Sequence, residues 1–137
     1  MNKLIPIVAL LLLLGAAPAG SSTRAEGMSV VSTAGAKFYG YATAAVAVQP
    51  GAEITYYNFD IEKHNVVQDP VADGIASSKK QKWCRDFPKK LCPVFWSELT
   101  GLGEVPVLGL ENVEPGQVYT FYCTLHTSMK GRLVAVP

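Results

Sequence analysis

The sequence has little histidine, little cysteine and almost no excess charge. Its 137 residues include two histidines, three cysteines and three methionines, and 12 basic against 11 acidic residues give a net charge of +1. A near-neutral chain lacks the basic excess that binds phosphate backbones, so nucleic acid is not an expected partner. Two histidines exclude a multinuclear copper or iron centre and a three-histidine zinc site, which leaves room for one mononuclear site.

Long hydrophobic runs are missing beyond the N-terminus. Lys3, the apolar run at residues 4–14 and a small-residue cleavage motif predict a secretory signal peptide over residues 1–19. A flexible lead-in over 20–27 and one domain over 28–137 are expected to follow. The apolar run is short for a membrane span and no second run follows. We therefore expect a periplasmic or extracellular protein without a transmembrane segment once the leader is removed; tethering by an uncleaved leader is the alternative.

Helical periodicity is also absent over any useful length. Short β-type runs separated by the turns Pro50-Gly51 and Pro115-Gly116 instead predict an all-β sandwich. The expected strand-like runs are residues 30–31, 37–41, 44–48, 53–59, 66–67, 105–110, 118–123 and 133–136.

The segment from about Ala72 to Leu102 differs from the rest of the chain. It holds several aromatic residues and six of the eleven basic residues that follow the predicted leader, namely Lys79, Lys80, Lys82, Arg85, Lys89 and Lys90. Cys84 and Cys92 lie within it, and in an oxidising compartment they are expected to form a disulfide that staples an insertion between strands. A second metal-binding pair is the alternative for these cysteines.

The cluster of Lys79, Lys80 and Lys82 has two interpretations. Surface lysines usually form nothing more than a solvated surface. The functional alternative is a docking face for an acidic redox partner, because opposite charges steer protein encounters and make electron transfer sensitive to salt.

The most informative stretch lies near the C-terminus. Cys123, His126 and Met129 stand at a spacing of Cys-x2-His-x2-Met between two strand-like runs, and His64 follows another such run. One thiolate, two imidazoles and a weak thioether form the ligand set of a mononuclear blue-copper site. Zinc is the main competing metal, although it has little use for a thioether. If Cys84 pairs with Cys92, a metal also explains the unpaired Cys123 in an oxidising compartment.

Two stretches of the chain resemble the type 1 blue-copper proteins, or cupredoxins, of the plastocyanin and amicyanin group. One is Val48-Gln-Pro-Gly-Ala-Glu-Ile-Thr-Tyr-Tyr-Asn-Phe-Asp60 leading to His64-Asn65-Val66. The other is Tyr119-x-Phe-x-Cys123-x2-His126-x2-Met129-x-Gly131. The resemblance implies a Greek-key β-sandwich that binds one Cu(I)/Cu(II) ion, with His64, Cys123 and His126 as equatorial ligands and Met129 as the axial ligand.

The resemblance also implies roles for residues beside the ligands. The side chain of Asn65 is expected to brace the ligand loop, whereas an ordinary turn residue is the alternative reading. The second histidine is expected to reach the surface through an apolar patch to which Leu125 contributes. The ligand loop carries Thr127 and Ser128 and no proline, unlike the amicyanin-type loop, which leaves the reduction potential open.

The expected function is single-electron transfer by a monomer that is not an enzyme. Its partners would be redox proteins such as a cytochrome, an oxidase or a dehydrogenase. A copper carrier or storage protein would use the same ligands and is the alternative. A domain whose metal is incidental is a third reading, distinguished by unchanged stability when the metal is removed.

Overall fold

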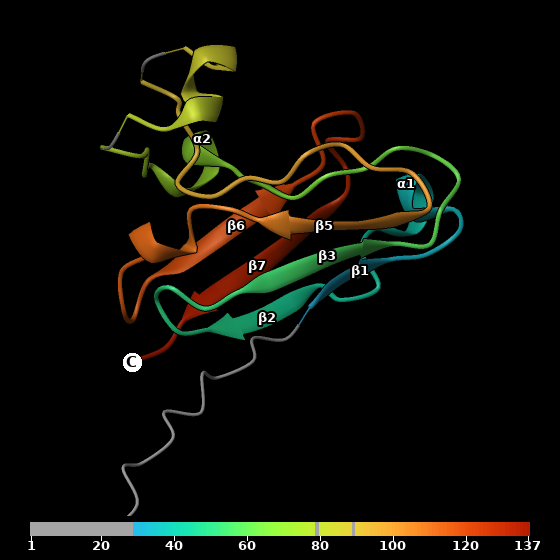
Figure 1. Cartoon of the computed structure of the whole chain (residues 1–137), viewed down its shortest axis with the longest axis horizontal. Helices are drawn as coiled ribbons and strands as arrows, with labels where there is room; N and C mark the ends of the chain where they lie inside the picture. Colours follow the sequence, from blue (N-terminus) through green and yellow to red (C-terminus); the bar gives the residue numbers. More distant parts are fainter. Residues whose placement is uncertain (1–28, 79, 89) are drawn as a thin grey trace, which may run out of the picture.

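The structure is a computed structural model that describes residues 29–78, 80–88 and 90–137 (Figure 1). The predicted leader at 1–19, the lead-in at 20–27 and Lys79 lie outside the described residues. Within the described ranges, no helix combines the length and the apolar character that a membrane crossing requires.

Three strands form the smaller of two sheets. Their spatial order is β1-β3-β5, with β1 parallel to β3 and β3 antiparallel to β5. Their bounds are β1 Val30–Ser32, β3 Ile54–Asn58 and β5 Gly103–Val107. Along β3 the side chains alternate between buried and half-buried, as expected for a strand with one face on a core.

Four strands form the second sheet, in the order β2-β7-β6-β4. β2 runs parallel to β7, whereas β7 with β6 and β6 with β4 are antiparallel. Their bounds are β2 Ala45–Val48, β4 Val67–Gln68, β6 Val118–Tyr122 and β7 Lys130–Ala135. Strict alternation of exposed and buried residues along β7 shows that one face of this sheet points inward.

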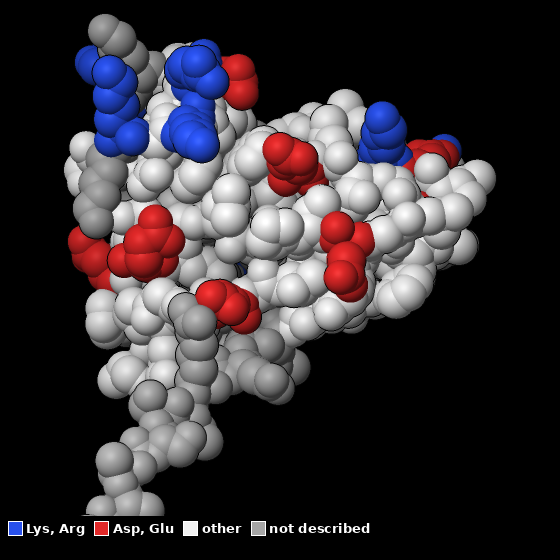
Figure 2. Space-filling model, viewed as in Figure 1, with Lys and Arg blue, Asp and Glu red and all other residues white. Residues whose placement is uncertain are grey.

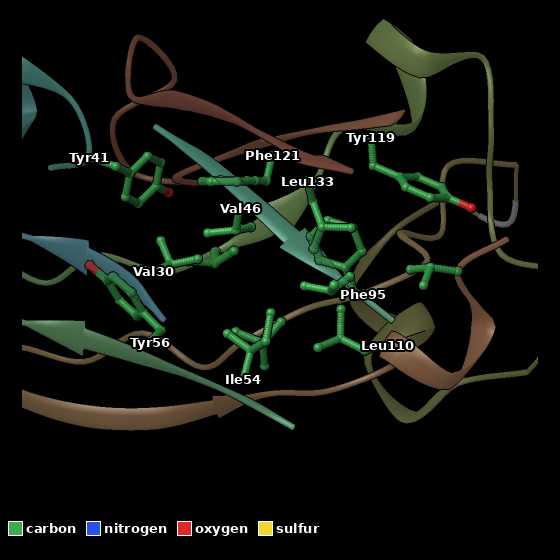
Figure 3. Close-up of a cluster of buried hydrophobic side chains, with 14 of the residues drawn as sticks. Val30, Tyr41, Val46, Ile54, Tyr56, Phe95, Leu110, Tyr119, Phe121 and Leu133 are labelled. Atoms are coloured by element: carbon green, nitrogen blue, oxygen red, sulfur yellow. The ribbon is translucent and has the colours of Figure 1, made fainter. Parts of the chain in front are cut away.

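Large aromatic and aliphatic side chains from both sheets fill the space between them (Figure 3). Tyr56 comes from one sheet, Tyr119, Phe121 and Leu133 come from the other, and Phe95 joins them from the segment before β5. Phe95 packs edge-on against Tyr119 with ring centroids 6.0 Å apart. The expected all-β sandwich is thus confirmed.

The prediction of a strand-like run at Lys37 to Tyr41 was wrong, because most of this run is the one-turn helix α1, Ala36–Tyr39. Gly35 and Gly40 bracket the helix at φ 80° and 82°, a conformation that favours glycine and breaks a strand. Asp60 stabilises the start of the helix, because its Oδ2 accepts the backbone N–H groups of Gly35 at 3.0 Å and Ala36 at 3.2 Å. Apolar content suggested a strand here, but tertiary hydrogen bonds determine the outcome.

The remaining helical turns are short and connect strands. They are α2 at Pro70–Asp73 and the 3-10 helices η1 at Lys82–Asp86 and η2 at Leu110–Asn112. Asp69 caps α2 by accepting the backbone N–H groups of Val71 and Ala72.

Residues 77–92, here called the basic lobe, project from the sandwich beside α2 (Figure 1, top left). The disulfide between Cys84 and Cys92 closes the lobe, which confirms the expected stapled insertion. Trp83 stacks on Trp96 with ring centroids 5.9 Å apart, and its Nε1–H donates to the carbonyl of Pro93 at 2.9 Å. Trp83 and Cys92 are buried but lie outside the main core cluster, so the lobe has a small apolar centre of its own.

Candidate metal centre

Two segments from different sheets bring the predicted ligands together. His64 follows β3 and is fixed by paired backbone hydrogen bonds with Thr100, at 3.1 and 3.0 Å. Cys123 directly follows β6, and His126 and Met129 lie in the loop that leads into β7. The ligand loop is therefore a tight connection between adjacent antiparallel strands, as the sequence spacing indicated.

The three nitrogen and sulfur donors form a compact triangle. The Nδ1 atoms of His64 and His126 lie 3.8 and 3.9 Å from Sγ of Cys123 and 3.1 Å from each other. A point equidistant from these atoms is about 2.1 Å from each, close to the bonds of about 2.0–2.3 Å that imidazole nitrogen and thiolate sulfur make to a divalent metal such as zinc. The donor triangle therefore has the right size for one metal ion.

Backbone hydrogen bonds close the ligand loop on itself. The N–H of Met129 donates to the carbonyl of His126 at 2.8 Å, and the N–H of Cys123 donates to the carbonyl of Met129 at 3.2 Å. Met129 is fully buried in this loop, beside the three donors. His64 and Cys123 are also fully buried, whereas His126 is partly exposed among the described residues.

Asp60 holds the far side of the His64 ring. Its Oδ2 lies 3.2 Å from Nε2 of His64, and the carboxylate also accepts backbone N–H groups of Gly35, Ala36 and Glu62. Desolvation of this buried carboxyl opposes ionisation, but the hydrogen bonds from His64 and from the backbone outweigh it and lower the pKa of Asp60 to about 2. An ionised Asp60 accepts Nε2–H of His64 and leaves Nδ1 as the metal-binding nitrogen.

Asn65 links the two ligand segments. Its Oδ1 accepts the backbone N–H of Thr124 at 2.9 Å and the hydroxyl of Thr124 at 3.1 Å. Tyr41 donates its hydroxyl to the backbone carbonyl of Asn65. Burial, together with the nearby charge of Cys123, raises the pKa of Tyr41, so the tyrosine stays protonated and keeps this hydrogen bond. Asn65 thus contacts the residue that directly follows Cys123, as a side chain that braces the ligand loop must.

His126 presents its outer edge to the surface beside charged side chains. Its Nε2 lies 3.4 Å from Oε2 of Glu62, and Glu62 in turn pairs with Lys37. Leu125 is 56% exposed next to His126. An acidic side chain thus stands against His126, a feature that the expected apolar patch around this histidine did not include.

The other predicted residues lie away from the metal centre. Lys80 and Lys82 are exposed on the basic lobe, and Lys79 lies outside the described residues. The structure therefore joins His64, Cys123, His126, Met129 and Asn65 in one site and leaves the lysine cluster as a separate surface.

Three residues of the site were missed by sequence reasoning. Asp60, Glu62 and Tyr41 contact ligands or their supports through side chains that the sequence pattern does not mark. The available signal was the acid four residues before His64, but acidic residues are common in loops and the pattern alone is not specific. Tyr41 carried no signal, because its contact with Asn65 depends on the tertiary fold.

The donor set determines which metal the centre suits. Two imidazoles and one thiolate in a buried triangle, with a thioether nearby, match the trigonal His2Cys site with a weak axial ligand that binds copper for electron transfer. A structural zinc site would instead need a fourth strong ligand. Among the described residues, no further histidine, cysteine or carboxylate group joins this cluster. The cofactor is one copper ion.

Comparisons with known proteins agree with this geometry. Comparison with curated proteins gave no significant match. Among solved structures, a purple cupredoxin from Nitrosopumilus maritimus is similar with a TM-score of 0.54 and 18% identity, over 78% of this chain and 97% of that chain. An oxidised variant of amicyanin reaches a TM-score of 0.52 at 16% identity, over 79% of this chain and 80% of that one.

A reduced variant of amicyanin has a TM-score of 0.51 and 17% identity over the same shares of the two chains. At these identities the structural likeness shows the fold. The family assignment comes from the sequence, since residues 28–136 match the copper binding proteins of the plastocyanin/azurin family. With that match over most of its length and with its His-Cys-His centre in place, the chain belongs to the plastocyanin/azurin family of copper-binding proteins.

Proposed function

We propose that this protein carries single electrons between redox partners outside the cytoplasm. The family comprises small electron carriers that are not enzymes, which gives the general function. The observation that supports shuttling most directly is the burial of His64, Cys123 and Met129 within a hydrogen-bonded frame. A centre held in this way changes little between Cu(I) and Cu(II), as fast electron exchange requires.

The same burial argues against a role in copper delivery or storage. Handing copper to another protein needs ligands that the acceptor can reach one after another. Among the described ligand residues, only His126 reaches the surface, while Asp60 and Asn65 hold the two ligand segments in place. The carrier function is therefore the less favoured alternative.

The surface around His126 is the proposed site of electron exchange. Met129 is proposed as the axial ligand that closes the centre from inside, so electrons would enter and leave through His126. Exposed apolar side chains flank this end of the molecule: Phe38 and Tyr39 on α1, Ile61 beside Glu62, and Leu125. An exposed apolar group of this kind is suited to brief contacts with a partner protein.

Export through the predicted leader at residues 1–19 completes the proposal. A periplasmic or extracellular location fits the Cys84–Cys92 disulfide, since such bonds persist in oxidising compartments. Tethering by an uncleaved leader would keep the same function at a membrane surface. N-terminal sequencing of the protein purified from its host distinguishes these two forms.

Spectroscopy of the copper-loaded protein tests the proposed centre. With Cu(II) the protein should turn intensely blue, because the thiolate of Cys123 bonds covalently to the metal, and Cys123→Ser should abolish the colour. Ser128→Ala, an exposed change in the same loop, is the matched control and should keep the colour. A colourless Cu(II) complex of the folded protein would refute the type 1 site.

Redox measurements then distinguish electron shuttling from copper delivery or storage. An electron shuttle should cycle reversibly between Cu(II) and Cu(I) and keep its metal in the presence of a moderate chelator. Sluggish electrode response with rapid loss of copper to the chelator would support the carrier function instead.

A further inference from the structure

Charges of opposite sign are separated between the basic lobe and the rest of the domain. Residues 77–92 contain six basic residues and one acidic residue, whereas the remainder of 29–137 contains four basic and nine acidic residues. Figure 2 shows Lys and Arg gathered at the top left, with acidic residues over the sandwich. The near-zero net charge of the whole chain therefore hides a strongly dipolar molecule.

The basic side chains of the lobe are available at its surface. Lys80, Lys82, Arg85 and Lys90 are all exposed. Among the described residues, the ion pairs with carboxylates are formed by Lys37, His64, His126 and Lys130, all of which lie outside the lobe. The positive charge of the lobe is thus not neutralised by pairing within the part of the chain that the structure describes.

The backbone that presents these charges is fixed at several points. Besides the Cys84–Cys92 disulfide, the N–H of Ser77 donates to the carbonyl of Cys92 at 2.7 Å. The stack of Trp83 on Trp96 attaches the lobe to the segment before β5. A partner that binds here would need to order little of the chain, which reduces the entropic cost of association.

The lobe and the copper-ligand loop border the same groove. This groove, with a volume of about 440 Å³, is lined by Asp86 and Phe87 of the lobe, by Asn65 and Thr124, and by Trp96, Glu98 and Leu99 of the segment before β5. Asn65 and Thr124 directly follow His64 and Cys123. A protein that contacts the lobe across this groove would therefore lie next to the metal centre.

We propose that the basic lobe is the recognition surface for a redox protein with an acidic face, and that it orients this partner for electron exchange with the copper centre. The inference rests on the proposed function and names the partner's chemistry. Positive charge on the lobe attracts the acidic face, and the acidic remainder of the domain repels it from other orientations. On docking, the reduced centre of the partner loses one electron and Cu(II) becomes Cu(I), with no bond made or broken.

Reduction kinetics test the proposal with two soluble c-type cytochromes, one of acidic and one of basic surface charge. The copper-loaded wild type and the triple variant Lys80→Glu/Lys82→Glu/Arg85→Glu are mixed with each reduced cytochrome in a stopped-flow instrument. At low salt the triple variant should react with the acidic cytochrome at least about tenfold more slowly than the wild type does, a difference that should shrink as salt is added. With the basic cytochrome, its rate should not fall.

A matched pair of single variants controls for total charge. Lys82→Glu lies on the lobe, and Arg132→Glu makes the same change of charge at an exposed position of β7. Lys82→Glu should slow the reaction with the acidic cytochrome clearly more than Arg132→Glu does. Equal effects would overturn the proposal, because they would show a response to net charge alone. The blue absorption of each variant confirms that its copper centre is intact.

Two further measurements separate the remaining outcomes. If hexaammineruthenium(II), a small cationic reductant, fails to reduce the wild-type copper centre, the proposed function fails and the inference fails with it. If this reagent reduces the copper centre but the acidic cytochrome reduces the triple variant as fast as the wild type, the docking proposal alone is overturned. Lobe-dependent sedimentation with phosphatidylglycerol vesicles, together with such equal rates, would likewise overturn it and identify an anionic membrane as the target.

Discussion

At the scale of single residues, Asp60 connects the metal centre to the surrounding fold. One carboxylate accepts Nε2–H of His64 and the N–H groups that begin α1. The orientation of a copper ligand and the shape of the turn at residues 35–40 therefore depend on the same buried charge. Sharing a charge in this way makes the ligand ring rigid before any metal arrives, which is the usual effect of a hydrogen-bonded partner behind a ligating histidine.

Asp60 should make the metal-free protein sensitive to acid. Its pKa in the folded state is lowered to about 2, below the ordinary value near 3.8, so its ionised form stabilises the fold fully above pH 4. This contribution is lost as the pH falls from about 4 towards 2. Asp60→Asn should lower stability at neutral pH and flatten the dependence between pH 4 and 2.

Urea denaturation of the metal-free wild type and variant, at pH values from 2 to 7, measures this effect. Glu104→Gln, an exposed acid on β5, is the control and should keep the wild-type profile. Parallel profiles for wild type and Asp60→Asn would contradict the proposed role of the carboxylate.

Met129 offers a second test on a single side chain. If its thioether is the weak axial donor, Met129→Leu removes a ligand that stabilises Cu(II) more than Cu(I), so the reduction potential should rise while the blue colour persists. The swap conserves volume and should cost under about 1.5 kcal/mol in stability. Protein-film voltammetry measures the potential, and an unchanged value would show that Met129 is not the axial ligand.

At the scale of elements, the ligand loop depends on how β6 and β7 pack behind it. Gly131 on β7 pairs with Phe121 on β6, and a Cβ at position 131 would lie only 2.2 Å from the Phe121 ring. Phe121 is fully buried and packs against Tyr41 with ring centroids 5.0 Å apart. The absence of a side chain at Gly131 thus allows the aromatic support of the centre to lie flat against β7.

Gly131→Ala should therefore destabilise the domain by about 1–3 kcal/mol, the usual cost of overpacking a core. The displaced ring should also disturb the ligand loop, seen as a shifted or weakened blue absorption. Gly103→Ala on β5 is the matched control, because a Cβ there meets only ordinary contacts, and its effect should stay within about 0.5 kcal/mol. Chemical denaturation of both variants decides the matter, and equal stabilities would contradict the packing argument.

The same elements explain how far the sequence could predict the structure. The β-type run at residues 53–59 predicted a strand, and the structure has β3 there with alternating burial. This strand and the position of His64 shortly after it were therefore predictable from the local pattern. The spacing of Cys123, His126 and Met129 required a tight loop, and that loop defines most of the site. The strand prediction at residues 37–41 was wrong because the helix there is held by hydrogen bonds to Asp60. These bonds leave no local signal in the sequence, so the apolar content of the run decided the prediction.

Contacts between distant segments were beyond sequence reasoning for a physical reason. The pairings of Tyr41 with Asn65 and of Glu62 with His126 arise only when the sheets pack, so no spacing along the chain encodes them. The basic composition of the lobe was visible in the sequence. The position of the lobe beside a groove shared with Thr124 was not visible in the sequence, because this position depends on the stacking of Trp83 against Trp96.

At the scale of the whole molecule, the metal centre joins the two sheets at one end. His64 follows a strand of the β1-β3-β5 sheet, whereas Cys123, His126 and Met129 connect two strands of the other sheet. His64 and Cys123 are 59 positions apart in the sequence, so the donor triangle exists only in the folded state. Copper should therefore bind the folded protein far better than the unfolded chain and act as a link between the sheets.

Copper loading should accordingly raise the thermal midpoint. At free copper 100-fold above the dissociation constant, preferential binding adds about 2.7 kcal/mol to the free energy of unfolding, which for a domain of this size corresponds to roughly 10 °C. Differential scanning calorimetry with and without metal measures the shift, and Cys123→Ser should lose most of it because the thiolate is gone. An unchanged midpoint in the wild type would mean that the sandwich does not need its metal and that copper binding contributes nothing to holding the sheets together.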